Sequence, residues 1–60
     1  MNAEIVDQAA DLFIGREQDG HYSLFNDEGE KVPYDDAPTR ARSRYDRWEL
    51  RRQGQLELFK

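Results

Sequence analysis

The chain has 60 residues, 37% of them charged, with a net charge of −4 and no Cys. This length allows one domain, which buries only about 60% of the surface that the unfolded chain exposes, and it excludes an enzyme with two lobes. No apolar run approaches the roughly 18 residues of a membrane span or resembles a signal peptide. Without Cys there are no disulfides and no thiolate metal sites. We therefore expect a cytoplasmic protein without a membrane segment, metal or cofactor.

The first predicted element is an amphipathic helix over residues 3–14. Its apolar residues recur at spacings of three and four: Ile5, Val6, Ala9, Ala10, Leu12 and Phe13. Gly15 is expected to end this helix, because glycine adopts the left-handed conformation at little cost. An alternative is that residues 13–14 open a strand.

A β-hairpin is predicted next. Residues 21–25 and 31–34 alternate as strands do. Between them, residues 26–29 have turn formers first and Gly29 last, as in a type I turn that closes through a left-handed glycine. Because Pro33 has no N–H group, the second strand is expected at a sheet edge.

A second helix is predicted from Asp36, as its N-cap, to Gln53, with Gly54 as the residue that ends it. Its apolar stripe, expected to face the hairpin, consists of Ala41, Tyr45, Trp48 and the stem of Arg52. The predicted fold is therefore a small α+β domain over residues 1–54, in the order helix, β-hairpin, helix. An extended C-terminal tail follows over residues 55–60.

The charges are divided unevenly along the chain. Residues 1–36 carry ten acidic against two basic groups, a net −8, whereas residues 37–60 carry a net +4. One interpretation is that the two halves attract each other. The other is that arginines of the second helix contact DNA phosphates, with Arg47, Arg51 and Arg52 as the candidates. Since the six arginines of this helix point in most directions, the first interpretation is favoured.

Catalytic groups are scarce. His21 is the only imidazole, and Ser23 lies two residues beyond it. A nucleophile and its base need a third group to orient the base, and the sequence offers none. We therefore expect no enzymatic activity.

The last residues carry the clearest motif. The sequence Gln55-Leu56-Glu57-Leu58-Phe59 resembles the bacterial sliding-clamp-binding motif, Gln-Leu-(Ser/Asp)-Leu-Phe, and departs from it only at Glu57. The resemblance implies that Leu58 and Phe59 fill an apolar pocket on the clamp, that Leu56 covers the adjoining surface and that Gln55 forms a hydrogen bond. Eukaryotic and archaeal motifs need an aromatic pair beyond this point, so the match is to the bacterial type.

The resulting functional hypothesis is a non-enzymatic binder of the bacterial DNA sliding clamp. Such a protein suits a phage- or plasmid-type modulator or inhibitor of host DNA replication, with DNA as a secondary contact. One alternative is structural, since residues 55–59 also alternate and would add a third strand to the hairpin. The other is functional, a DNA mimic in which the acidic residues 1–36 block a nucleic-acid-binding enzyme.

Overall fold

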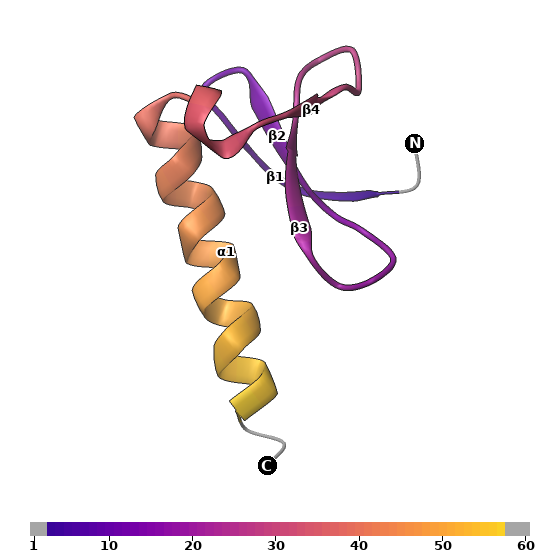
Figure 1. Ribbon diagram of the computed structural model, residues 1–60, viewed down its shortest axis with the longest axis vertical. Helices are drawn as coiled ribbons and strands as arrows, with labels where there is room; N and C mark the ends of the chain where they lie inside the picture. Colours follow the sequence, from indigo (N-terminus) through magenta and orange to yellow (C-terminus); the bar gives the residue numbers. More distant parts are fainter. Residues whose placement is uncertain (1–2, 58–60) are drawn as a thin grey trace.

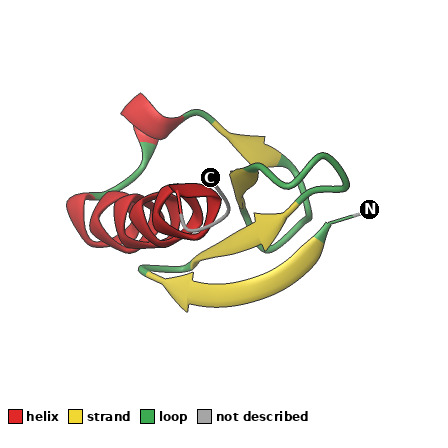
Figure 2. Cartoon of the chain, turned by 90° about the horizontal axis from the view of Figure 1, so that it is seen from below, coloured by secondary structure: helices red, strands yellow, loops and turns green. Residues whose placement is uncertain are grey.

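The structure, a computed structural model, describes the backbone of residues 3–57 and the side chains of residues 3–54. The strands β1 (Glu4–Ala9), β2 (Leu12–Arg16), β3 (Tyr22–Phe25) and β4 (Lys31–Val32) form an antiparallel sheet in the order β1-β2-β3-β4. A 3-10 turn, η1 (Tyr34–Asp36), leads to the helix α1 (Thr39–Glu57), which covers one face of the sheet (Figures 1 and 2). The fold is α+β, as predicted, but the described residues contain one α-helix and not two.

The predicted helix over residues 3–14 is wrong, because these residues form β1 and the first half of β2. The two strands are joined by Ala10 and Asp11, whose φ angles are 51° and 65°. Two positive φ angles in succession match the twist of an antiparallel pair, as in a type I′ turn. Neither residue is glycine, so the turn has no sequence signature. The alternative strand at residues 13–14 is confirmed by β2.

A β-bulge in β1 is a second reason why the sequence did not predict β1 as a strand. Ile5 lies opposite Gly15 and Asp7 lies opposite Ile14, so Val6 is an extra residue in the pairing. A bulge of this kind interrupts the alternation of side chains along the strand. Asp7 therefore faces α1, although its polarity suggests a solvent-facing position.

Gly15 lies within β2, where its missing side chain makes room for an aromatic ring. A Cβ atom at this position would be 2.8 Å from Cε2 of Phe25 and 3.1 Å from Cβ of Ala3. The prediction that Gly15 ends a helix is therefore wrong. Its function is to let the Phe25 ring lie against the sheet on the face away from α1.

The predicted hairpin is confirmed by β3 and β4, but its second strand is shorter than predicted, because β4 ends at Val32 and Tyr34 belongs to η1. Gly29 has a φ of 83°, and its N–H group donates to the carbonyl oxygen of Asn26 at 3.0 Å. The side-chain oxygen of Asn26 accepts from the N–H groups of Glu28 and Glu30, which fixes the turn. As Pro33 predicted, β4 is an edge strand.

The apolar stripe of α1 packs on the sheet as predicted. Ala41 is 0% exposed, and Tyr45 and Trp48 pack against the core beside it. The Trp48 and Tyr22 ring centroids are 5.6 Å apart, and the Tyr45 hydroxyl donates to the carbonyl oxygen of Tyr22 at 3.0 Å. The buried residues of this core are Ala9, Ile14, Tyr22, Leu24, Ala37 and Ala41.

Both predicted ends of this helix need correction. The carbonyl oxygen of Pro38 accepts the N–H of Arg42 at 3.0 Å, so α1 begins at Thr39, and Asp36 belongs to η1. At the other end, α1 continues through Gly54 to Glu57, so the extended tail is wrong for residues 55–57. Residues 58–60 lie outside the described residues.

Asp7 ties β1 to α1. Its carboxylate accepts from Nε1 of Trp48 at 2.9 Å and pairs with Arg44 at 2.9 Å. It also accepts the N–H of Gln8 at 2.8 Å. The Trp48 hydrogen bond, followed by those from Gln8 and Arg44, holds the pKa of Asp7 below its ordinary value of 3.8 despite partial burial.

This lowered pKa predicts a specific loss of stability in acid. A carboxyl whose pKa is lower in the folded than in the unfolded chain stabilises the fold above its unfolded pKa, near 4. That contribution is lost as the pH falls through the folded pKa. Asp7→Asn is therefore expected to be less stable than the parent at pH 7 and to lose less stability below about pH 4, measured by thermal melts. Asp27→Asn, at an exposed turn, is the control, and parallel pH profiles for parent and Asp7→Asn would contradict the prediction.

Candidate partner-binding surfaces

The first three residues of the predicted clamp motif belong to α1. The backbone of residues 55–57 is helical, which makes the alternative of an added strand wrong for these three residues. Leu58 and Phe59 lie outside the described residues. The C-terminal part of α1 projects beyond the sheet (Figure 1), so the helical part of the motif lies at the end of a projecting arm.

The last turns of α1 have few stabilising contacts among the described side chains. Trp48 is the last of these in α1 that packs against the core, and Leu50 is 69% exposed. Gly54 lies inside the helix, where a Cβ atom would meet nothing within 4 Å. Glycine weakens a helix interior by about 1 kcal/mol relative to alanine. Among the described side chains, the part of α1 beyond Trp48 is therefore weakly held to the rest of the fold.

Four of the six arginines of α1 form one stripe. They are spaced by four, three and four residues, which places them on one side of a helix: Arg40, Arg44, Arg47 and Arg51. The expectation that the arginines point in most directions is thus wrong for these four. Of the predicted DNA contacts, Arg47 and Arg51 belong to this arginine stripe. Arg52 lies on another side, half-buried, with its Nη1 4.0 Å from Oε2 of Glu49.

The contacts of these arginines show how the two charged halves meet. Arg44 pairs with Asp7, and this is the one ion pair, among the described side chains, that joins residues 1–36 to α1. The Arg51 guanidinium carbon lies 4.8 Å from the Trp48 ring centroid. Arg47 is exposed, without an ion pair to any side chain of residues 3–54. Among the side chains of residues 3–54, the predicted attraction between the halves therefore amounts to a single ion pair.

No helix or strand of residues 3–57 covers the face of the sheet opposite α1, and this face is partly apolar. Phe25 follows the core residue Leu24 on β3 and so points to this opposite face, where Phe13 is its cross-strand partner. Together with Ile5, these rings line a hollow of about 220 Å³. Ile5 is 45% exposed and Phe25 is 3% exposed. We call this surface the open sheet face.

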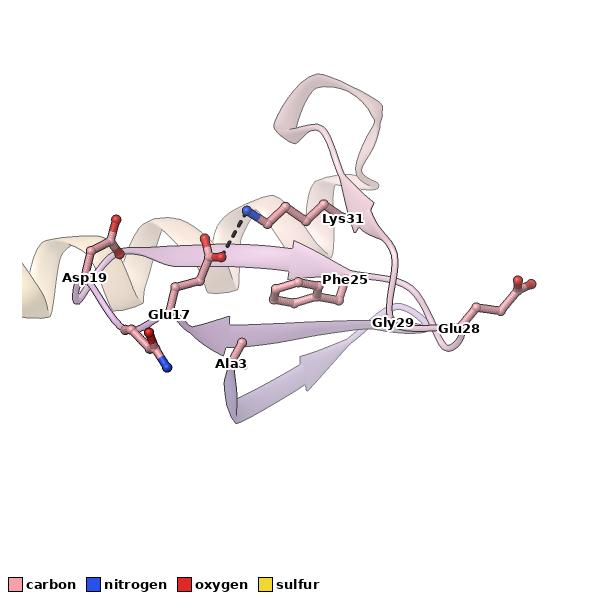
Figure 3. Close-up of a pocket in the computed structure, with 8 residues that line it drawn as sticks. Ala3, Glu17, Asp19, Phe25, Glu28, Gly29 and Lys31 are labelled. Atoms are coloured by element: carbon pink, nitrogen blue, oxygen red, sulfur yellow. Dashed lines mark ion pairs between the residues drawn. The ribbon is translucent and has the colours of Figure 1, made fainter. Parts of the chain in front are cut away.

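Acidic groups surround the open sheet face. Glu17, Asp19 and Glu28 line a second hollow, of about 770 Å³, beside Phe25 (Figure 3). Across the sheet, Asp11 and Asp27 line a third hollow together with Phe13. Within residues 3–54, none of these acidic groups but Glu17 has a cationic partner.

Glu17 is held in place by its neighbours on this face. It pairs with Lys31 at 3.0 Å and accepts the hydroxyl hydrogen of Ser23. The Ser23 hydrogen bond, followed by that from Lys31, lowers the pKa of Glu17, so this carboxylate stays charged at neutral pH. Ser23 is thus committed to Glu17 and not to His21, which is exposed at the preceding turn.

The described residues offer no further type of site. No group of three or more His, Cys, Asp or Glu among them is arranged to hold a metal ion. No helix in this part of the chain is both long and apolar enough to cross a membrane. Comparison with known protein families, curated proteins and solved structures gives no match for the chain.

The arginines and the predicted motif are visible in the sequence, whereas the open sheet face was not predicted from it. It assigned Ile5 and Phe13 to a helix and Gly15 to its end, although all three lie on this face. The usable signal was Phe13-Ile14, which fits a strand as well as a helix.

Proposed function

We propose that this chain is a non-enzymatic, cytoplasmic binder of the bacterial DNA sliding clamp and modulates or inhibits DNA replication. The observation that carries the proposal is the match of Gln55, Leu56, Leu58 and Phe59 to the clamp-binding motif. Each buried anchor side chain contributes roughly 1.5–3 kcal/mol. After the cost of ordering the segment, a dissociation constant of about 1 µM is expected.

The position of the motif on α1 supports a recognition step that includes unwinding. An extended peptide buries alternate side chains and fixes its register through its backbone. Residues 55–57 are helical in the free chain, so docking in this mode unwinds the last turn of α1. Gly54 keeps the cost of that step low.

Substitutions at Gly54 are therefore expected to change clamp affinity. Gly54→Ala fits into open space, stabilises the helix by about 1 kcal/mol and should weaken clamp binding by about fivefold. Gly54→Pro breaks the helix before the motif and should bind at least as tightly as the parent. Circular dichroism and calorimetric titration measure the two effects. Equal clamp affinity for both variants, despite different helix content, would contradict coupled unwinding.

Direct titration tests the proposed function. The purified bacterial clamp is titrated with the full chain and with a chain that lacks residues 55–60. Binding by the full chain alone supports the proposal, and binding by neither chain overturns it. Because apolar anchors dominate the contact, the affinity should change little between roughly 50 and 300 mM salt.

DNA threaded through the clamp is a proposed second contact of Arg47, Arg51 and Arg52. The first two share the arginine stripe and are exposed, as phosphate contacts must be. Arg47→Glu combined with Arg51→Glu should weaken binding to DNA-loaded clamp and leave binding to free clamp unchanged. An equal loss in both titrations would remove DNA from the proposal.

A second candidate function is mimicry of DNA by the acidic surface. It is favoured by the four acidic residues around the open sheet face that have no cationic partner within residues 3–54: Asp11, Asp19, Asp27 and Glu28. A partner that binds nucleic acid through basic groups would then lose affinity steeply with salt. The salt titration described above separates the two candidates.

A further inference from the structure

The open sheet face has the form of a docking site for one apolar side chain flanked by positive charge. Its central hollow, lined by Ile5, Phe13 and Phe25, measures about 220 Å³. This is below the roughly 300–1,000 Å³ of small-molecule pockets, and it has the scale of a side chain. The exposed carboxylate of Asp27 borders it, and that of Asp11 lines the adjoining hollow, which shares Phe13 and Asp27 with it. A partner that fits must present an aliphatic or aromatic side chain next to a cation.

The outer surface of α1 presents this combination. Leu50 is 69% exposed, and Arg47, three residues before it, lies beside it on the helix surface. Ser43 and Gly54, on the same exposed side, are small, so Leu50 stands above its surroundings. Asp46 is the acidic neighbour of Leu50, and it accepts the Tyr34 hydroxyl at 2.9 Å.

These two surfaces lie on opposite sides of the molecule. α1 packs on one face of the sheet through Ala41 and Trp48, and Leu50 is on the side of the helix that faces away from the sheet. The open sheet face is the other face of the sheet, the one away from α1 (Figure 2). Complementary surfaces on opposite sides cannot meet within one chain, but they can meet between two.

We propose that copies of this chain associate head to tail, with Leu50 of one copy in the hollow of Ile5, Phe13 and Phe25 of the next. Arg47 then lies against Asp11 and Asp27 of that copy. The −8 and +4 segments, which share one ion pair among the described side chains, attract each other between chains. This contact uses two different surfaces, so association continues beyond a dimer unless a ring closes.

The contact is expected to be weak and dependent on salt. One helix against one small sheet face buries less than the roughly 1,000 Å² of a stable interface, so association should appear at about 100 µM and above. Charge pairs at its edge are exposed and are screened at high salt. The proposal does not depend on clamp binding, since residues 55–60 take no part in it.

Sedimentation velocity tests the association. The average mass should rise above the 7.1 kDa of one chain between about 10 µM and 1 mM, and less so in roughly 500 mM salt. Asp35→Asn, an exposed change in η1 that lines none of the hollows of the open sheet face, is the control and should behave as the parent. A parent chain that stays monomeric over this range overturns the proposal.

Two complementary variants test the head-to-tail arrangement. Leu50→Asp removes the inserted side chain, and Ile5→Asp places a carboxylate in the lining of the apolar hollow. Each variant alone should therefore be monomeric. Mixed in equal amounts, they retain one intact pair of surfaces and should form a dimer that does not grow. If Ile5→Asp fails to fold, Asp27→Arg replaces it. Association of Ile5→Asp alone, or no dimer in the mixture, overturns the arrangement.

Discussion

We expect the Trp48→Ala variant to be largely unfolded near room temperature. Heating it should therefore show no cooperative unfolding transition. Trp48 is partly buried against the core, and truncation of a large core aromatic side chain to alanine costs up to about 3–5 kcal/mol. Native domains are stable by only about 5–15 kcal/mol, and a chain of 60 residues belongs at the low end of that range. The loss is therefore comparable to the whole stability of the fold.

The contacts of Trp48 explain why its replacement should cost so much of the stability of the fold. Its ring packs on Tyr22 at 5.6 Å between centroids and carries the Arg51 guanidinium on its surface. Its N–H group donates to Asp7 at 2.9 Å. The substitution therefore opens a cavity and also removes the main hydrogen bond to a half-buried carboxylate, which adds to the cost.

Trp48→Phe is the matched control for this experiment. It keeps an aromatic ring against Tyr22 and loses the hydrogen bond to Asp7, so it should remain folded and lose about 1–3 kcal/mol. Because Trp48 is the only tryptophan, both variants are followed by circular dichroism during heating. A midpoint for Trp48→Ala within a few degrees of the parent would show that the helix is held by other contacts.

The parts of the fold that could be predicted are those with a local sequence signal. The hairpin of β3 and β4 has a left-handed Gly29 at its turn, and the helix α1 has its apolar stripe through Trp48. β1 and β2 lack such signals: their turn is made by Ala10 and Asp11 at positive φ, and a bulge at Val6 breaks the alternation. With both signals missing, the spacing of the apolar residues matched a helix.

The candidate partner-binding surfaces also differ in whether a local sequence pattern reveals them. A linear motif at residues 55–59 is readable because its residues are consecutive, and the arginines are visible as a cluster. The open sheet face is assembled from three strands and two turns, so no local pattern contains it. Its center is Phe25, which is buried against Gly15 by cross-strand packing that only the correct register reveals.

Leu58→Ala combined with Phe59→Ala is expected to abolish binding to the bacterial clamp. These two residues are the proposed pocket fillers, and truncation of one anchor in a desolvated pocket costs about 2 kcal/mol or more. Two such losses move a contact of about 1 µM beyond about 1 mM, out of the range of calorimetric titration. Leu50→Ala is the matched control, because it removes an exposed leucine of α1 and leaves the motif intact.

The thermal midpoint of the same double variant separates docking from a structural role. If residues 58 and 59 serve docking alone, loss of their side chains should leave the midpoint nearly unchanged, with the core formed by the described sheet residues, Ala37 and the first half of α1. If these side chains instead supplied core, a domain with so little apolar material would melt early. Lost clamp affinity with an unchanged midpoint supports docking through the motif. Unchanged clamp affinity, or none in the parent, would end the clamp proposal whatever the melting curve shows.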